Sequence, residues 1–347
     1  MNINKRVSLL WRRARVLLSI LICKLTGRRV PVVVYLYPTY KCNLRCVYCL
    51  VDHSVEVKEM DKGQLLRLVD ELAEMGTRMI VFLGGEFSIV KGIEDVIDRI
   101  IEKGMICDAV TNAILLPKKL DLFKKMDSLC ISMDGIGTSN DITRGKGTSE
   151  KILNSIRIAK KEGISVRINC VITKYNRHTY RQLLEWAKGN NLLVTFGMPF
   201  EDEIKDMLLD EDDMKQFYRE LVQLKKDGYP VLFSYEAIDH MLNYPGSPSE
   251  FIMKAQAGDA NIDKRYKKRC PYGSFIAYIH SDGMLLPCNN LYKLRRKGVN
   301  IWEAGLKNAW DSFAEIDCLS CYEAGIPEWN FLTSLKGILK GISITLK

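Results

Sequence analysis

Three cysteines near the start of the chain have a spacing that suits metal-based redox chemistry. Three residues separate Cys42 from Cys46, and two separate Cys46 from Cys49. They follow an apolar, β-branched run at 32–37 that predicts a buried strand. Thiolates spaced in this way on a loop can bind three irons of a [4Fe–4S] cluster, whereas complete ligation needs four cysteines. The fourth iron is then open to a small molecule, and an open position distinguishes reactive metal sites from structural ones.

The segment from Cys42 to Cys49, with Tyr48 just before the third cysteine, resembles the signature of the radical S-adenosylmethionine (radical SAM) enzymes. The resemblance implies that the open iron binds the amino and carboxylate groups of S-adenosylmethionine (SAM). It also implies that one electron cleaves SAM to a 5′-deoxyadenosyl radical, and that a reductant such as flavodoxin or ferredoxin supplies this electron. A structural zinc site that adds His53 to the three cysteines is the alternative, because four such ligands complete a tetrahedron.

Four later cysteines predict a second metal site: Cys270, Cys288, Cys318 and Cys321. Residues 278–287 predict a β-hairpin with Asp282-Gly283 as its turn, which would let the first two cysteines reach one metal. Four thiolates complete a cluster and leave no open iron. The pattern is similar to the auxiliary-cluster module called twitch, a shortened SPASM domain, and it implies a second [4Fe–4S] cluster. A zinc ribbon is the alternative.

Strand and helix patterns alternate six times between 32 and 199, which predicts parallel strands joined by right-handed crossovers. Six units are too few for a closed eight-unit barrel. They match the open (β/α)6 partial TIM barrel of the radical SAM family, so we expect an α/β fold. The expected divisions are a basic amphipathic helix at 1–30, the partial barrel at 31–200, a helical connection at 201–265, a twitch-like hairpin and helix module at 266–325, and a basic amphipathic tail at 326–347.

Polar residues follow the predicted strands at their carboxyl ends, where barrels of this kind carry their function. Glycines at such a point permit close approach of the backbone to a ligand. The resemblance implies that the turn at 84–86 contacts the amino group of SAM, although Phe87 replaces the usual proline. Arg144 could bind the SAM carboxylate through its planar fork, and a solvated loop arginine is the alternative. The residues expected to contact SAM are Tyr48, Gly84, Gly85, Glu86, Asn112, Ser132 and Arg144. No catalytic residue is assigned.

The net charge of +9 belongs to the two ends of the chain. Residues 1–30 carry eight basic side chains and residues 331–347 carry three, with no acid in either segment, which leaves −2 on the rest. A basic nucleic-acid-binding surface is therefore not expected. The cysteines are clustered as metal ligands are, which indicates a reducing compartment and hence the cytoplasm.

The N-terminal segment has one apolar helical face: Val7, Leu10, Trp11, Ala14, Leu17, Leu18, Leu21, Ile22 and Leu25. With its basic side chains it resembles an interfacial helix on an anionic membrane, and the uncharged run at 16–23 is too short to span one. A secretory signal is the rival, but no small-residue cleavage site follows. A helix that packs on the barrel is the third alternative. The tail at 331–347 repeats the amphipathic pattern more weakly.

These observations predict a radical SAM enzyme with one auxiliary cluster that abstracts hydrogen from a lipid or lipid-linked substrate at the inner membrane face. The lipid rests on analogy with radical SAM relatives that act on hopanoids and isoprenoids. A peptide or a small soluble metabolite is the alternative substrate. A protein of another class, in which both cysteine sets bind structural zinc without catalysis, is the alternative function.

Overall fold

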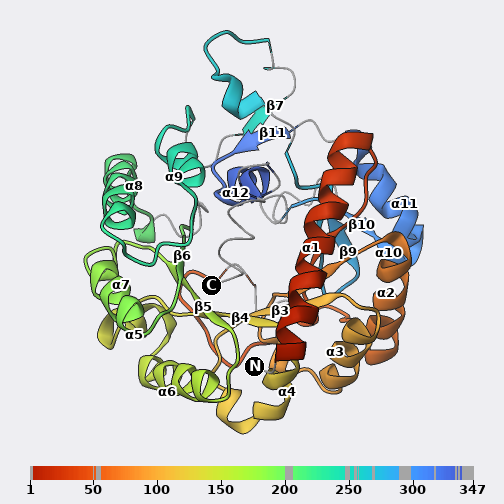
Figure 1. Cartoon of the computed structure of the whole chain (residues 1–347), viewed down its shortest axis with the longest axis horizontal. Coiled ribbons are helices and arrows are strands. Elements are labelled where there is room, and N and C mark those ends of the chain that lie inside the picture. Colours follow the sequence, from red (N-terminus) through yellow and green to blue (C-terminus); the bar gives the residue numbers. More distant parts are fainter. Residues whose placement is uncertain are drawn as a thin grey trace.

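Six parallel strands form the centre of the fold, and helices cover their outer side (Figure 1). The computed structural model describes residues 3–49, 51, 56–199, 206–246, 251–253, 256, 258–267, 270–288, 298–315, 318–332, 334 and 337. The strands pair in chain order: β1 (Val33–Leu36), β2 (Met79–Phe82), β3 (Ile106–Thr111), β4 (Ser128–Ser132), β5 (Val166–Val171) and β6 (Val194–Gly197). The helices between them are α2 (Lys62–Met75), α3 (Ile93–Glu102), α4 (Leu120–Lys125), α5 (Thr138–Arg144), α6 (Thr148–Lys161) and α7 (Tyr180–Gly189). The expected α/β fold with a partial barrel is confirmed.

The alternation of side chains along each strand separates an outer layer from the barrel interior. On β1, Val34 and Leu36 are fully buried in the cluster that includes the outer helices, whereas Tyr35 belongs to a second cluster inside the barrel. On β3, Ala109 joins the outer layer and Asp108 lies on the other face. Burial of apolar surface therefore stabilises the outer layer, and the interior face is left for polar and aromatic groups.

Local capping chemistry sets the helix boundaries. Asp61 caps α2 by accepting from the Gln64 N–H, and the Gln64 side chain bonds back to the Asp61 backbone, which is a capping box. Asp210 caps α8 (Glu211–Lys226) in the same position, as the acidic run there predicts. The helix α5 was not predicted, because its short sequence resembles a polar loop.

The sheet continues past β1 into the C-terminal half of the chain. The strand β8 (Ile276–Ile279) pairs with β1 in parallel. It is followed by the antiparallel strands β9 (Met284–Leu286) and β10 (Val299–Asn300). Gly283 has a φ of +81° at the predicted hairpin turn. The hairpin is therefore one wall of the barrel, next to the first strand.

The other C-terminal elements lie beside the edge strands of the sheet. The helix α8 packs on α9 (Tyr235–Leu242), which contacts α12 (Gly325–Leu332). A separate two-stranded sheet pairs β7 (Phe251–Met253) with β11 (Cys318–Cys321). Two short helices, α10 (Ile301–Ala304) and α11 (Leu306–Asp311), follow β10 and continue the ring of outer helices seen in Figure 1.

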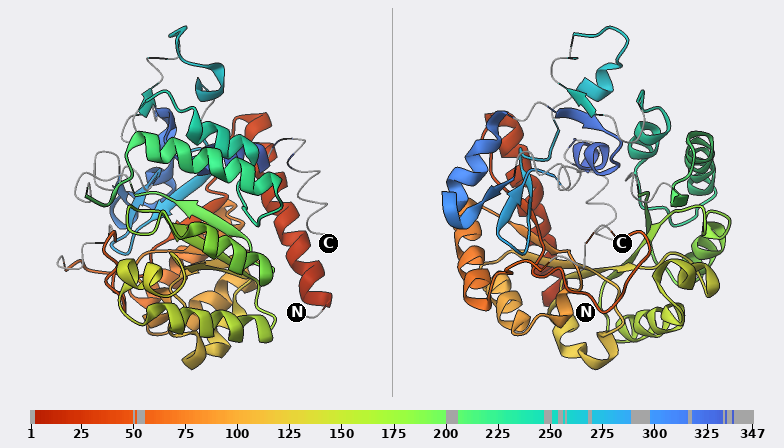
Figure 2. Two further views of the ribbon diagram at one scale, coloured as in Figure 1. Left: turned by 90° about the vertical axis from the view of Figure 1, so that its left-hand side faces the viewer. Right: turned by 180° about the vertical axis from the view of Figure 1, so that it is seen from behind.

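The helix α1 (Ile3–Thr26) lies across the amino ends of the strands (Figures 1 and 2). Arg12 donates to the main-chain oxygen of Met105, just before β3, at 2.9 Å. Arg12 also makes two hydrogen bonds of 2.6 Å to Asp127, just before β4. Four side chains of α1 are buried in the interior cluster: Leu9, Val16, Ile20 and Cys23. The alternative in which this helix packs on the barrel is therefore the one that the structure shows.

A second apolar stripe of α1 stays exposed. Its side chains are Val7, Trp11, Leu18, Ile22 and Leu25, with exposed fractions between 43% for Ile22 and 77% for Leu25. This stripe belongs to the apolar face recognised in the sequence, and the buried stripe is a different one. Among the described residues, no helix is long and apolar enough to cross a bilayer.

We predict that Arg12→Ala lowers the free energy of unfolding by about 3 kcal/mol, because it leaves the Asp127 carboxylate buried without its partner. Asp127 is 3% exposed and would keep the hydrogen bond from the Cys107 N–H at 3.0 Å, but no cation. Urea denaturation of the two proteins measures the difference. Arg13→Ala is the matched control, since Arg13 is the exposed neighbour. Equal destabilisation by the two substitutions would contradict the prediction.

Candidate active site

The loop after β1 carries the first set of predicted cluster ligands. Cys42 and Cys46 are half-buried and Cys49 is exposed, and their sulfurs are near enough to act on one another electrostatically. Burial raises the pKa of the Cys42 thiol, and it raises the pKa of Cys46 to about 11. A metal that binds here must therefore displace protons. The fourth ligand of the zinc alternative, His53, lies outside the described residues.

A buried carboxylate, that of Asp134, holds the cysteine loop against the barrel. It accepts hydrogen bonds from the Tyr48 hydroxyl at 2.6 Å, the Thr143 hydroxyl at 2.8 Å and the Val171 N–H at 2.9 Å. Arg144 adds Nη2 at 3.0 Å from Oδ1 and Nε at 2.9 Å from Oδ2. Tyr48, which we predicted as a SAM contact, thus ties its loop to the carboxyl end of β4.

Arg144 is buried at the end of α5, so its interpretation as a solvated loop arginine is wrong. It is 5% exposed, and its guanidinium carbon lies 5.6 Å from the centroid of the Tyr48 ring. Its Nη1 lies 3.9 Å from the Cys46 sulfur. A positive charge at this distance favours the thiolate form that binds metal. Its contact with the SAM carboxylate stays a prediction, and the observed partner of its fork is Asp134.

Gly84 and Gly85 let the end of β2 approach the cysteine loop. A Cβ on Gly85 would lie 2.0 Å from the main-chain oxygen of Lys41, and one on Gly84 would lie 2.5 Å from that of Thr39. The N–H groups of Gly85 and Glu86 donate to these two oxygens at 2.9 Å. We attributed the glycines to the approach of a ligand, whereas the close contact in the structure is with the backbone of the loop itself.

The Glu86 side chain clamps β2 to β3 beneath the loop. It is 1% exposed and accepts from the Thr111 hydroxyl at 2.8 Å and from the Asn112 N–H at 3.0 Å. The Asn112 side-chain nitrogen lies 3.8 Å from the Cys42 sulfur. Ser132 is half-buried at the end of β4, on the interior face. The contacts of these residues with SAM stay predictions.

The second cysteine set lies at the amino end of the barrel strands, opposite the first. Cys270 precedes β8, and Cys288 follows β9, which runs back in the antiparallel direction. Cys318 and Cys321 are the terminal residues of β11, and the four sulfurs act on one another electrostatically. In the part of the chain that the structure describes, no three His, Cys, Asp or Glu side chains are placed to hold a single metal ion.

Six aromatic side chains line the interior where β1 meets β8, and we call them the aromatic seam: Tyr35, Tyr37, Tyr40, Tyr272, Tyr278 and His280. Tyr35 stacks on Tyr278 with ring centroids 4.8 Å apart, and Tyr37 stacks on His280 at 4.2 Å. The seam extends from Tyr272, beside the second cysteine set, to Tyr40, beside the first. We missed it in the sequence, because the residues come from distant segments. The sequence pattern that could have revealed the seam is the pair of alternating aromatic positions in each strand region, at 35 and 37 and at 278 and 280.

An ion pair in the barrel interior was also missed. The Arg167 Nη1 donates to the Ser128 hydroxyl at 3.0 Å and lies 3.8 Å from the Asp108 Oδ2. Asp108 is 5% exposed, and its Oδ1 has no hydrogen-bond partner among the described residues. Burial raises the pKa of Asp108, which the charge of Arg167 partly opposes. The sequence pattern that could have revealed the ion pair is one charged residue inside each of two predicted strands that are otherwise mostly apolar.

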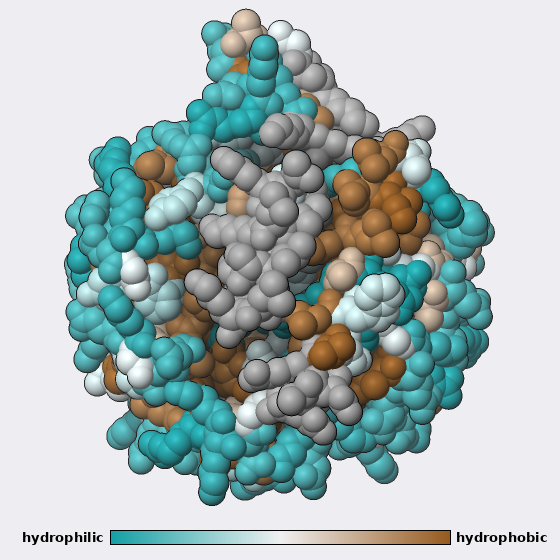
Figure 3. Space-filling view, in the orientation of Figure 1, coloured by the Kyte–Doolittle hydropathy of each residue, from teal (hydrophilic) through white to brown (hydrophobic). Residues whose placement is uncertain are grey.

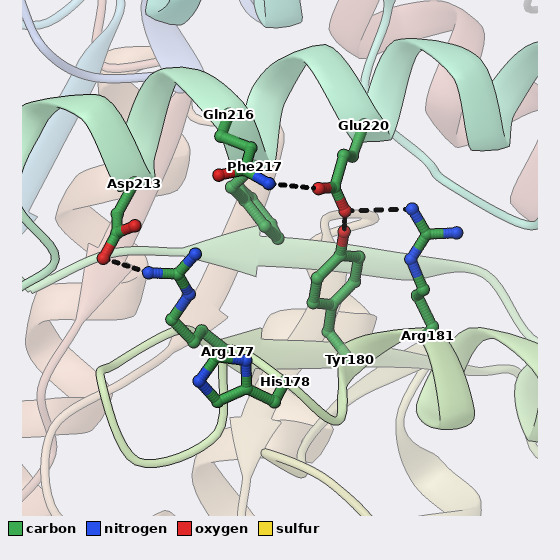
Figure 4. Close-up of a pocket in the computed structure, with 8 residues that line it drawn as sticks. All are labelled: Arg177, His178, Tyr180, Arg181, Asp213, Gln216, Phe217 and Glu220. Carbon is green, nitrogen blue, oxygen red and sulfur yellow. Dashed lines mark hydrogen bonds and ion pairs between the residues drawn. The ribbon is translucent and has the colours of Figure 1, made fainter.

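A polar pocket lies between the start of α7 and α8 (Figure 4). Arg177 pairs with Asp213 across it, and Glu220 accepts from both Tyr180 and Arg181. No predicted site residue is among the described residues that line it. Because its acidic and basic groups satisfy one another, this pocket is a clamp between the two helices and adds nothing to the chemistry of the cysteine loop.

Comparisons with known proteins agree with the chemistry of the first loop. The family described as the Radical SAM superfamily matches residues 36–187. A GTP 3′,8-cyclase of Clostridium botulinum (strain Langeland) is 34% identical over 293 residues, which are 79% of this chain and 83% of that protein. The chain belongs to the radical SAM superfamily. It is therefore related to enzymes that bind SAM and a [4Fe–4S] cluster.

Other proteins are similar to this chain over a smaller share of their length. Molybdenum cofactor biosynthesis protein 1 of Dictyostelium discoideum is 30% identical over 211 residues, which are 57% of this chain and 32% of that protein. The chain spans only about a third of that relative. The structure of Streptococcus suis SuiB bound to the precursor peptide SuiA has a TM-score of 0.66 at 17% identity. The match covers 92% of this chain and 77% of the SuiB chain, and it shows that the two proteins share a fold.

We predict that Gly85→Ala displaces the cysteine loop, because the added Cβ would meet the Lys41 carbonyl at 2.0 Å. Iron bound at the first set should fall by more than half in anaerobically reconstituted protein, while the protein remains folded. Gly189→Ala is the matched control, since nothing lies within 4 Å of a Cβ there. The same iron content in both variants would contradict the prediction.

Proposed function

We propose that this radical SAM enzyme holds two [4Fe–4S] clusters, one at Cys42, Cys46 and Cys49 and an auxiliary one at the second cysteine set. The observation that carries the proposal is the placement of the two sets at opposite ends of one barrel. A substrate in the interior would lie between the radical source at one end and a redox centre at the other. The C-terminal hairpin and β11 together would then act as the twitch-like module expected at 266–325.

The groups around the first set fit a cluster with one open iron, because three thiols share one loop. The Leu44 N–H donates to the Cys42 sulfur at 3.4 Å, and Arg144 lies beside the Cys46 sulfur. Such hydrogen bonds and charges tune the reduction potential of a cluster. When bound, the cluster and SAM supply a 5′-deoxyadenosyl radical that takes a hydrogen atom from the substrate. The exposed Cys49 marks where a flavodoxin or ferredoxin would deliver the electron.

The second set fits a cluster of a different kind, because four thiols leave no open iron. Cys270 and Cys321 are buried, whereas Cys288 and Cys318 are half-buried. Burial and hydrogen bonding to sulfur would set its potential. Its proposed role is therefore to accept an electron from the substrate or to donate one, without binding the substrate directly.

We propose a peptide or a soluble polar metabolite as the substrate in place of a lipid. The interior carries the buried ion pair of Asp108 and Arg167, and the Asp108 Oδ1 has no partner among the described residues. A polar substrate can supply a hydrogen bond to such a group, whereas an acyl chain cannot. The relative from C. botulinum is named for GTP, and SuiB was solved with a peptide. In addition, α1 lies at the end of the barrel opposite the cysteine loop, so a membrane beneath α1 would not meet the first cluster.

Iron analysis and SAM cleavage test the proposal together. Anaerobically reconstituted protein should hold about eight irons per chain, and the triple Ala variant of Cys42, Cys46 and Cys49 should keep about four. Dithionite-reduced wild type should release 5′-deoxyadenosine from SAM, and the triple variant should release none. Stoichiometric zinc without sulfide would contradict both clusters and favour the zinc alternatives.

We propose separately that α1 docks the protein on an anionic membrane face. The exposed basic residues Arg13, in α1, and Arg28, just after it, accompany the exposed stripe, and the helix contains no acidic residue. Figure 3 shows apolar side chains gathered over the part of this face that α1 crosses. Each basic side chain near an anionic leaflet contributes about 1 kcal/mol, and insertion of the apolar stripe adds to this. Charge complementarity therefore favours a lipid surface over a neutral partner.

Flotation with phosphatidylserine-containing vesicles tests this docking. Full-length protein should float with the vesicles at low salt, and the double variant Trp11→Glu, Leu25→Glu should lose at least about nine-tenths of this binding. Leu193→Glu with Tyr235→Glu is the matched control on exposed apolar positions elsewhere. Substitution is preferable to removal of α1, because removal would uncover Asp127 and the apolar barrel residues that the buried stripe of α1 covers, such as Val33 and Ile276. Equal flotation of both double variants, or none by the full chain, would contradict the docking.

A further inference from the structure

The aromatic seam contains a direct hydrogen bond between the two segments that carry the cysteine sets. The Tyr40 Oη lies 2.7 Å from the His280 Nδ1. Tyr40 is close in the chain to Cys42, at the start of the first loop. His280 directly follows β8, on the hairpin that leads to Cys288. The bond therefore joins the loop of the first cluster to the hairpin of the auxiliary one.

Both partners of this bond are immobilised on their other sides. The Tyr40 N–H donates to the Glu59 carboxylate at 2.7 Å, and the Tyr40 main-chain oxygen lies 2.7 Å from where a Cβ of Gly85 would be. The His280 ring is 1% exposed and stacks on Tyr37 with an interplanar angle of 14°. Burial lowers the pKa of His280 to about 3, so the imidazole is neutral and can bond a phenol without bringing a charge to the site.

We propose that His280 is a positioning residue for the first cluster, which acts through Tyr40 to set the entry of the cysteine loop. The C-terminal hairpin carries cysteines of the auxiliary set at the amino end of the barrel. Through His280 it would also help to position the ligands of the first cluster at the carboxyl end. This inference rests on the proposed first cluster. It explains why an uncharged histidine, which is not itself among the expected metal ligands, is buried between two tyrosines of the barrel wall.

The test uses the reconstituted full chain and three variants: Tyr40→Phe, His280→Phe and the double variant. Each single substitution keeps an aromatic ring in the seam and removes the hydrogen bond. We expect each single variant to release 5′-deoxyadenosine from SAM about tenfold more slowly than wild type, and the double variant to be no slower than either single one, since one bond is lost in all three. Tyr175→Phe, at a position 46% exposed, is the control and should match wild type.

A spectroscopic measurement separates positioning from general packing. The electron paramagnetic resonance signal of the reduced first cluster, with and without SAM, should change in Tyr40→Phe and His280→Phe. The same two substitutions should also be made in the triple Ala variant of Cys42, Cys46 and Cys49. There they should leave the amount of iron bound at the auxiliary site unchanged, because they act on the first loop.

Three results would overturn the inference: rates and spectra equal to wild type, effects that multiply in the double variant, or equal loss of iron from both clusters. A wild type that binds no iron at all would instead overturn the proposed function, so the two failures are distinguishable. If wild type binds both clusters and cleaves SAM while the variants do so equally well, only the role of His280 is lost.

Discussion

The carboxylate of Asp134 is the interaction on which the cysteine loop depends. It has no contact with water, and an ionised group in such a place is stable only when donors surround it. Its donors come from the loop (Tyr48), from α5 (Thr143 and Arg144) and from the end of β5 (Val171). The position of the first cysteines relative to the barrel is thus set by directional bonds to one charge. Apolar contacts alone would leave the loop free to slide.

The alternation of strands and helices, the capped ends of α2 and α8, and the hairpin turn at Gly283 could all be predicted, because they follow from local patterns. The assignment of each cysteine set to one metal site stays a prediction from the spacing of its members. The hydrogen bonds that position these groups could not be predicted. Glu86 and Arg144 were expected to face SAM, yet their observed partners come from other elements, and no local pattern indicates which long-range partner a polar side chain will meet.

The N-terminal helix shows the same limit for apolar residues. Its sequence has enough apolar side chains for two stripes, and a helical projection identifies the broader one. The barrel covers the other stripe, because the hydrogen bonds from Arg12 to Asp127 fix the rotation of the helix about its axis. A basic side chain that looked solvent-facing in the sequence is therefore the residue that fixes the helix. The choice between packing and membrane docking was posed as exclusive, although the two stripes allow both.

The parallel pairing of β1 with β8 also determines the order in which this protein can fold. Val33 lies opposite Ile276, so the first strand has only one of its two neighbours until the chain has left the ribosome as far as β8. Closing so long a loop has an entropic cost and tends to make folding slow. During synthesis, one edge of β1 must wait unpaired, and such edges are prone to pair with other chains. The protein therefore has a period of vulnerability that ends only when the C-terminal hairpin docks, and chaperones or early cluster insertion would have their largest effect on yield during this interval.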